Sequence, residues 1–138
     1  MVLVDTPVWS LALRRKASDL SAQDRSLVQA LHQLIREGRV QLLGSTRQEV
    51  LSGIREESQF RRIRDDLRGF GNVKLEAEDY EEAARISNQC RRAGISGSPV
   101  DMLVCAVSQL RDWPVFTTDR DFVHYRRVIP LRLFSGSA

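Results

Sequence analysis

The chain has few of the residues that support thiol or histidine chemistry. Among its 138 residues, Cys90 and Cys105 are the only cysteines, and His32 and His124 are the only histidines. The cysteines form no CxxC motif and have no histidine at ligand spacing, so we expect two reduced, partly buried thiols. The histidines lie far apart and belong to no HExxH-type motif. The sequence therefore gives little support to a histidine-based metal site or a serine–histidine–aspartate triad.

Long apolar runs are also missing from the sequence. It contains no stretch of about 18 apolar residues, so we expect no membrane span. The first residues lack the basic start, apolar stretch and cleavage site of a signal peptide, which makes the cytoplasm the expected compartment. A composition of 42% hydrophobic and 28% charged residues is typical of one globular domain. We predict a single domain over residues 1–134 and a frayed tail over residues 135–138.

Lysine is scarce, although the chain is basic. Lys16 and Lys74 are the only lysines among 21 basic residues, so the formal net charge of +3 comes almost entirely from arginine. The arginine guanidinium can bind a phosphate through two parallel hydrogen bonds. Pairs of arginines recur at positions 14–15, 61–62, 91–92 and 126–127. Two interpretations stay open: a surface for nucleic acid, or ordinary solvated helix faces.

Short apolar segments alternate with amphipathic ones along the chain. We predict strands at residues 2–4, 40–43, 73–75, 115–117 and 128–133. We predict helices at residues 7–16, 21–37, 46–54, 60–70, 76–93 and 99–110. Thr6 is expected to cap the first helix, and Ser45 or Thr46 the third. The alternation predicts an α/β domain with a mainly parallel sheet and helices on both of its faces.

Acidic residues stand at the ends of several predicted elements. Asp5 directly follows the first strand, and Asp119 and Asp121 follow the strand at residues 115–117. Asp101 lies in the first turn of a helix, and Glu49 is expected near the start of another. Ligands of open α/β sheets bind beyond the carboxyl ends of the strands. We therefore expect these acids to converge on one rim of the sheet.

Several carboxylates close together repel one another unless a cation offsets their charge. Mg²⁺ and Mn²⁺ prefer such oxygen ligands, and they can activate water and stabilise the charge that develops on a phosphate. An acidic site within an arginine-rich surface suits phosphodiester hydrolysis. The alternative for each acid taken alone is a helix-capping role.

Four segments of the sequence resemble those of PIN-domain proteins, and in particular VapC toxins of bacterial toxin–antitoxin pairs. They are residues 2–9 (VLVDTPVW), 48–53 (QEVLSG), 99–106 (PVDMLVCA) and 117–122 (TTDRDF). The resemblance implies a three-layer α/β/α fold and an endoribonuclease that depends on Mg²⁺ or Mn²⁺. Pro7 stands where the family often has serine or asparagine.

The resemblance also implies roles for individual residues. The first three acids of the family map onto Asp5, Glu49 and Asp101, and the fourth maps onto Asp119 or Asp121. All of these acids, Glu49 included, would be catalytic, by holding the metal and through it activating water. Two hydroxyl positions of the family, which bind waters in the site, match Thr6 and Thr117.

The family further implies partners and a substrate. These are a homodimer, a VapB-like antitoxin that covers the active site, and a structured RNA, with transfer RNA expected and ribosomal RNA as the alternative. Two other functions stay open: a PIN-fold nuclease of RNA processing, and a non-catalytic PIN binding module. A receiver-type signalling domain fits poorly, because neither Lys16 nor Lys74 stands near the end of a late strand.

Overall fold

The computed structural model describes residues 1–135 and contains a three-stranded sheet, in the order β2-β1-β3. The central strand β1 (Val2–Val4) runs parallel to both β2 (Val40–Gln41) and β3 (Val115–Phe116). The predicted parallel sheet is thus confirmed. The tail predicted at residues 135–138 lies, beyond Ser135, outside the described residues.

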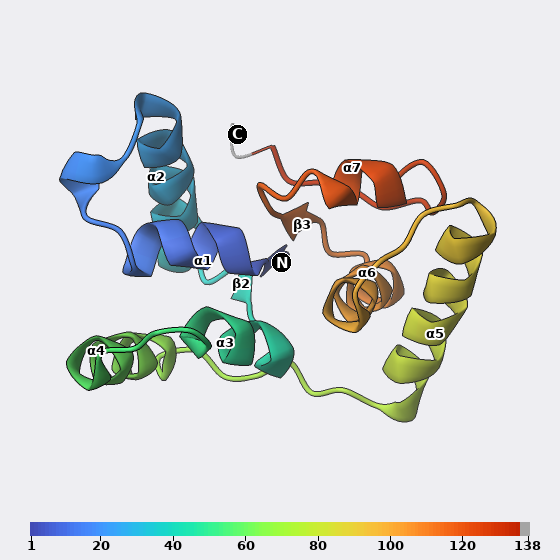
Figure 1. The fold of residues 1–138 in the computed structure, drawn as a ribbon, viewed down its shortest axis with the longest axis horizontal. Helices are drawn as coiled ribbons and strands as arrows, with labels where there is room; N and C mark the ends of the chain where they lie inside the picture. Colours follow the sequence, from blue (N-terminus) through green and yellow to red (C-terminus); the bar gives the residue numbers. More distant parts are fainter. Residues whose placement is uncertain (136–138) are drawn as a thin grey trace.

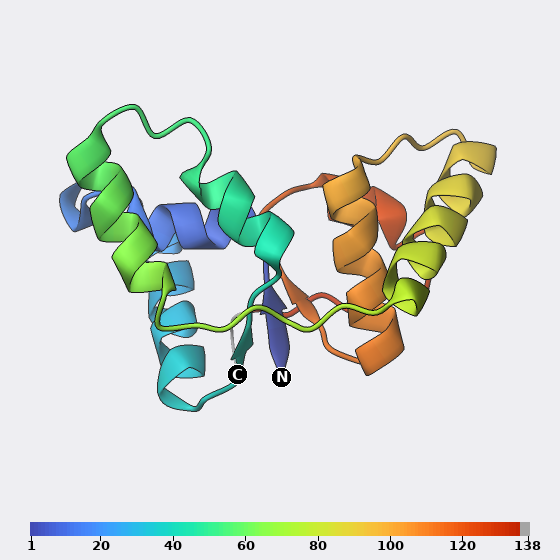
Figure 2. The ribbon, with the colours of Figure 1, turned by 90° about the horizontal axis from the view of Figure 1, so that it is seen from below.

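The helices form a layer on each side of this sheet (Figures 1 and 2). One layer holds α1 (Thr6–Leu13), α2 (Ala22–Arg36), α3 (Gly44–Leu51) and α4 (Glu57–Leu67). The other layer holds α5 (Ala77–Arg92), α6 (Pro99–Arg111) and α7 (Asp121–Tyr125). A short 3₁₀ helix, Ala17–Asp19, connects α1 to α2. The arrangement confirms the predicted three-layer α/β/α architecture. Within the described residues, no helix combines the length and apolarity that a bilayer span requires.

The central strand contributes side chains to both cores. Val2 and Val4 belong to a cluster with Trp9 of α1 and Leu31 of α2, whereas Leu3 packs on the opposite side against the α5 and α6 layer. Successive side chains of a strand point to opposite faces, so a strand covered on both sides must be apolar throughout. The run Val-Leu-Val meets this requirement and fixes the position of the residue that follows, Asp5.

Helix α6 begins where the sequence predicts, after a capping serine and at a proline. The Ser98 hydroxyl accepts a hydrogen bond from the backbone N–H of Asp101 at 3.1 Å, and Pro99 occupies the first turn. A proline here loses no hydrogen bond, since the first N–H groups of a helix have no partner within it. Asp101 is therefore held in the first turn, as predicted.

Two predicted strands do not form. Residues 73–75 form no strand, and the nearest pairing is an isolated bridge between Leu42 and Asn72, one residue earlier. Within residues 128–133 the structure has only an isolated bridge between Val115 and Leu133. The N–H groups of Val128 and Ile129 both bond to the Tyr125 carbonyl, so the chain is still turning after α7. Pro130 then offers no N–H for a ladder.

Several predicted boundaries also differ. Helix α1 ends at Leu13, and α4 covers Glu57–Leu67 rather than residues 60–70. Thr6 is not the N-cap of α1, because Asp5 holds that position, and Leu43 rather than Ser45 or Thr46 precedes α3. The cysteines are free, as predicted, but both are fully buried.

Candidate active site

The candidate acids gather at the carboxyl end of the sheet. Asp5 follows β1 and is the N-cap of α1, and Asp119 lies in the turn between β3 and α7. Asp121 is the first residue of α7, and Asp101 is the third residue of α6. Four residues from three distant segments of the sequence are thus brought to one edge, where ligands of parallel α/β sheets bind.

Three of these aspartates are close enough to share one ion. Asp101, Asp119 and Asp121 each offer a carboxylate oxygen, and these oxygens lie within 4.8 Å of one another. Asp101 and Asp119 are half-buried, whereas Asp121 is exposed. The donors are all oxygen atoms, the set that Mg²⁺ and Mn²⁺ prefer over softer nitrogen or sulfur ligands.

Asp5 is joined to this group through Thr117. The Thr117 hydroxyl donates to Asp5 Oδ2 at 2.9 Å and accepts a hydrogen bond from the backbone N–H of Asp119 at 3.1 Å. Asp5 is only 3% exposed, so its carboxylate has little solvent to stabilise it. One hydroxyl therefore fixes Asp5 relative to the turn that carries Asp119.

Burial, and after it repulsion from neighbouring acids, raises the pKa of Asp5 and of Asp101. Burial raises the pKa of Asp5 to about 6, and the charges of Asp101 and Glu49 act in the same direction. The Thr6 backbone and the Thr117 hydroxyl oppose this shift. Burial also raises the pKa of Asp101, again with repulsion from Asp119 and Glu49. The residues therefore fit a divalent cation, because an added positive charge would offset both the burial and the repulsion.

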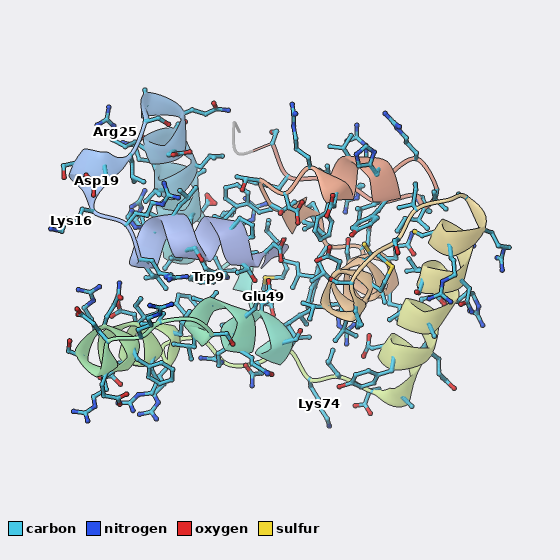
Figure 3. All side chains as sticks on the ribbon, viewed as in Figure 1. Trp9, Lys16, Asp19, Arg25, Glu49 and Lys74 are labelled. Atoms are coloured by element: carbon cyan, nitrogen blue, oxygen red, sulfur yellow. The ribbon has the colours of Figure 1, made fainter. Side chains whose placement is uncertain are left out.

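Glu49 occupies a different place from the one predicted. It lies in the second half of α3, not near its start, and its side chain is exposed. It is outside the group of three aspartates, although its charge acts on both Asp5 and Asp101. In Figure 3 it lies at the side of α3 that faces the middle of the molecule. Glu49 is therefore at the border of the cluster.

The two predicted hydroxyl residues differ in their surroundings. Thr117 bridges two acids, whereas the buried Thr6 Oγ1 has no hydrogen-bond partner among the described residues. A buried hydroxyl without a partner costs free energy. Its place directly after Asp5 is consistent with a role in binding water at the site.

Sequence reasoning missed Tyr125. Its hydroxyl donates to Asp101 Oδ2 at 2.7 Å, and its ring is buried against Phe122. Gly97 lies so close to Met102 and to the Tyr125 ring that a side chain there would meet both. The only sequence signal is the position of Tyr125 one helical turn after Asp121. The contact with Asp101 depends on how α7 packs against α6, which the sequence pattern does not reveal.

The thiols have no place in this chemistry. Cys105 is fully buried one turn after Asp101, and burial, followed by the charge of Asp101, raises the pKa of its thiol. A thiol that stays protonated is a poor nucleophile and a poor metal ligand.

The model of the PIN domain family matches residues 2–128 of the chain, so this protein belongs to the PIN domain family. PIN domains are generally nucleases. The resemblance seen in the sequence is thereby confirmed at the level of the family.

Several solved structures share the fold of this chain. FitAcB from Neisseria gonorrhoeae is 20% identical, with a TM-score of 0.76 over 99% of this chain and 98% of that one. VapBC2 from Rickettsia felis, bound to a DNA fragment from its promoter, is 13% identical, with a TM-score of 0.74 over 97% and 98%. A toxin–antitoxin complex from Klebsiella pneumoniae is 21% identical, with a TM-score of 0.63 over 88% and 90%. No curated protein matches the chain.

Proposed function

We propose that this protein is an endoribonuclease dependent on Mg²⁺ or Mn²⁺, and the toxin of a VapBC-type toxin–antitoxin pair. The observation that carries the proposal is the acid cluster, in which three carboxylates offer oxygens within 4.8 Å beside the buried Asp5. An arrangement that raises the pKa of its own acids is costly for the fold, and such clusters concentrate at functional sites.

The proposed ligands are Asp5, Asp101, Asp119 and Asp121, with Glu49 at the border of the site. A bound Mg²⁺ or Mn²⁺ would lower the pKa of a water and stabilise the charge on the phosphate undergoing cleavage. Asp119 is the stronger candidate for the fourth acid of the family, because it is half-buried and its charge acts on Asp101. One of its oxygens also accepts the backbone N–H of Asp121 at 2.9 Å, which orients the carboxylate.

The substrate and partners are inferred from charge and fold. An arginine-rich chain of net charge +3 suits RNA, and we propose a structured RNA such as transfer RNA. The compared structures include a toxin–antitoxin complex, which supports a VapB-like antitoxin here. The homodimer is proposed from the family resemblance alone. A basic antitoxin side chain would be stabilised among the acids. A PIN-fold nuclease of RNA processing would use the same site without an antitoxin.

The test is cleavage of purified bacterial RNA by wild type and by Asp101→Asn, with Mg²⁺, with Mn²⁺ and with EDTA. A matched control is Asp66→Asn, which removes the same charge from the exposed face of α4. We expect discrete fragments from wild type and the control in the presence of metal, and none from Asp101→Asn or with EDTA. Cleavage by Asp101→Asn at the wild-type rate would show that the assigned site is wrong.

A failure to cut has two possible origins, which a second measurement separates. Calorimetric titration with Mn²⁺ asks whether wild type binds the ion and Asp101→Asn does not. Binding without cleavage would point to a narrower RNA substrate, to be sought by expressing the protein in cells that lack an antitoxin. Neither binding nor cleavage would favour a non-catalytic PIN module.

A further inference from the structure

A second charged feature lies away from the acids, between the end of α1 and the start of α4. It is a cleft of about 720 Å³ with four basic residues in its lining: Arg14, Arg15, Lys16 and Arg62. We call it the basic cleft. Glu56 is the only acid in the lining, so the lining has a formal charge of +4 −1 = +3. This equals the net charge of the whole chain, so the remainder of the protein is close to neutral.

The basic residues of the cleft are not neutralised by the protein. None of the four forms an ion pair within residues 1–135, although Glu56 lies in the same lining. Other arginines of α4 behave differently, since Arg61 pairs with Glu57 at 3.1 Å and Arg64 with Asp65 at 3.0 Å. Four like charges in a cleft with a single counter-charge raise the local potential and attract an anion.

The rest of the lining is polar. Ser58 and Gln59 supply further hydrogen-bonding groups, and Leu13 is the only apolar residue. A protein partner needs a desolvated apolar centre, whereas surfaces for nucleic acid are more polar and much more basic. Three guanidinium groups also match the geometry of phosphates. The chemistry of the cleft therefore favours a nucleic-acid backbone over a polypeptide.

One helix connects the cleft to the acids. Asp5 is the N-cap of α1 and Arg14 is its C-cap. The eight helical residues between them span about 12 Å, at roughly 1.5 Å per residue. Figure 3 shows Lys16 beyond the outer end of α1, while Glu49 lies near the middle of the molecule. At about 3.4 Å per nucleotide of a stacked strand, that distance corresponds to roughly three or four nucleotides.

We propose that the basic cleft binds backbone phosphates of the RNA substrate, at least three to four nucleotides away from the bond cut at the acid cluster. This inference rests on the proposed ribonuclease function for the identity of the polyanion. Contacts to phosphates position a strand without reading its bases. The basic cleft would thus set affinity and register, while the acids perform the reaction.

The test measures binding of a fluorescein-labelled 12-nucleotide polyuridine by anisotropy, in EDTA so that nothing is cut. The cleft variant is Arg15→Gln/Arg62→Gln. The control, Arg68→Gln/Arg85→Gln, also removes two exposed arginine charges, but outside the cleft. We expect the cleft variant to raise the Kd about tenfold or more, and to reduce the salt dependence of binding by about two ionic contacts. The Kd of the control should stay near that of wild type. Equal melting temperatures for all three proteins would show that their folds are intact.

The outcomes separate this proposal from the nuclease assignment. If the cleft variant binds RNA as the control does, the proposal is overturned, whether or not wild type cuts RNA. If the cleft variant alone loses RNA binding but no protein cuts, the cleft is supported and the nuclease assignment fails. Where wild type cuts, the cleft variant should raise KM and leave kcat unchanged. Normal RNA binding with loss of a co-expressed antitoxin would instead make the cleft a protein-binding surface and refute the proposal.

Discussion

The Thr117 hydroxyl donates a 2.9 Å hydrogen bond to Asp5 Oδ2, joining residues 112 positions apart. Thr117→Val keeps the shape of the side chain but removes this bond and the acceptor for the Asp119 N–H. We expect it to destabilise the fold by about 1–2 kcal/mol and to weaken Mn²⁺ binding about tenfold. Urea unfolding and calorimetry measure the two effects. Thr117→Ser keeps the hydroxyl and should restore both; wild-type Mn²⁺ affinity in the valine variant would refute this role.

We expect Tyr125 to position Asp101, and Tyr125→Phe tests this role. The variant keeps the buried ring but loses the 2.7 Å hydrogen bond to Asp101 Oδ2. Loss of a bond that orients a metal ligand typically costs about 10–100-fold in metal affinity or activity. Tyr80→Phe is the matched control, since Tyr80 is the only other tyrosine and is exposed. Equal Mn²⁺ affinities for the two variants would contradict the assignment.

The raised pKa of Asp5 makes the metal-free protein less stable as the pH rises. Its pKa is about 6 in the folded state against 3.8 for the unfolded chain, so the folded state binds the proton more tightly. Stability from this group is full below about pH 4 and is lost as the pH passes through 6. In EDTA, Asp5→Asn should therefore be more stable than wild type at pH 8 by about 2–3 kcal/mol.

The same difference should disappear at pH 4, where wild-type Asp5 is protonated. Added Mn²⁺ should raise the melting temperature of wild type at pH 8 more than that of the variant. Thermal melts at the two pH values, with and without Mn²⁺, measure both effects. If the difference in stability between wild type and Asp5→Asn were the same at pH 4 and pH 8, burial would not raise the pKa of Asp5.

An ion pair remote from the site stabilises the second helical layer. Arg111 contacts both Asp79 oxygens, at 2.6 and 3.1 Å, and donates to the Lys74 carbonyl at 3.0 Å. Since Asp79 is buried, Arg111→Gln leaves its charge without a partner and should destabilise the fold by about 3 kcal/mol. The exposed pair of Arg61 and Glu57 is the control, and Arg61→Gln should cost no more than about 0.5 kcal/mol. Urea titration distinguishes the two.

Arg111 also lowers the pKa of Asp79, chiefly by hydrogen bonding, which gives that pair the opposite pH dependence from Asp5. The contribution of the Arg111–Asp79 ion pair to stability is present near neutral pH and is lost as the pH falls through the pKa of Asp79. The penalty of Arg111→Gln should therefore shrink in acid. A penalty that is constant down to pH 3 would show that packing, and not charge, dominates.

The parts of the fold that could be predicted are those with strong local signals. The run Val2 to Val4 is apolar on both faces, as a central parallel strand must be, and Ser98 with Pro99 fixes the start of α6. The strand predicted at residues 128–133 failed because hydrogen bonds to Tyr125 keep the chain turning, and Pro130 lacks a donor. Apolar residues alone do not distinguish a strand from an extended segment packed on the core.

The site was predictable where an acid directly follows a strand or opens a helix, as for Asp5 and Asp101. Glu49 was misplaced within its helix, because α3 begins at Gly44, without the hydroxyl cap that was expected. The spacing of Tyr125 from Asp121 gave no sign of its contact with Asp101, since that partner lies 24 residues away on another helix. Contacts of that kind follow from tertiary packing and are beyond periodicity and capping rules.

The strand order β2-β1-β3 puts the first strand of the chain in the middle, with the last strand beside it. During synthesis, Asp5 and Glu49 therefore emerge long before β3 and the turn with Asp119 and Asp121 are made. A chain interrupted before that turn lacks both Asp119 and Asp121, and one interrupted before β3 also leaves the central strand without one neighbour. The order of synthesis thus delays assembly of the acid cluster until almost the whole protein is present, so unfinished copies released from the ribosome lack two of the three aspartates that could share one ion.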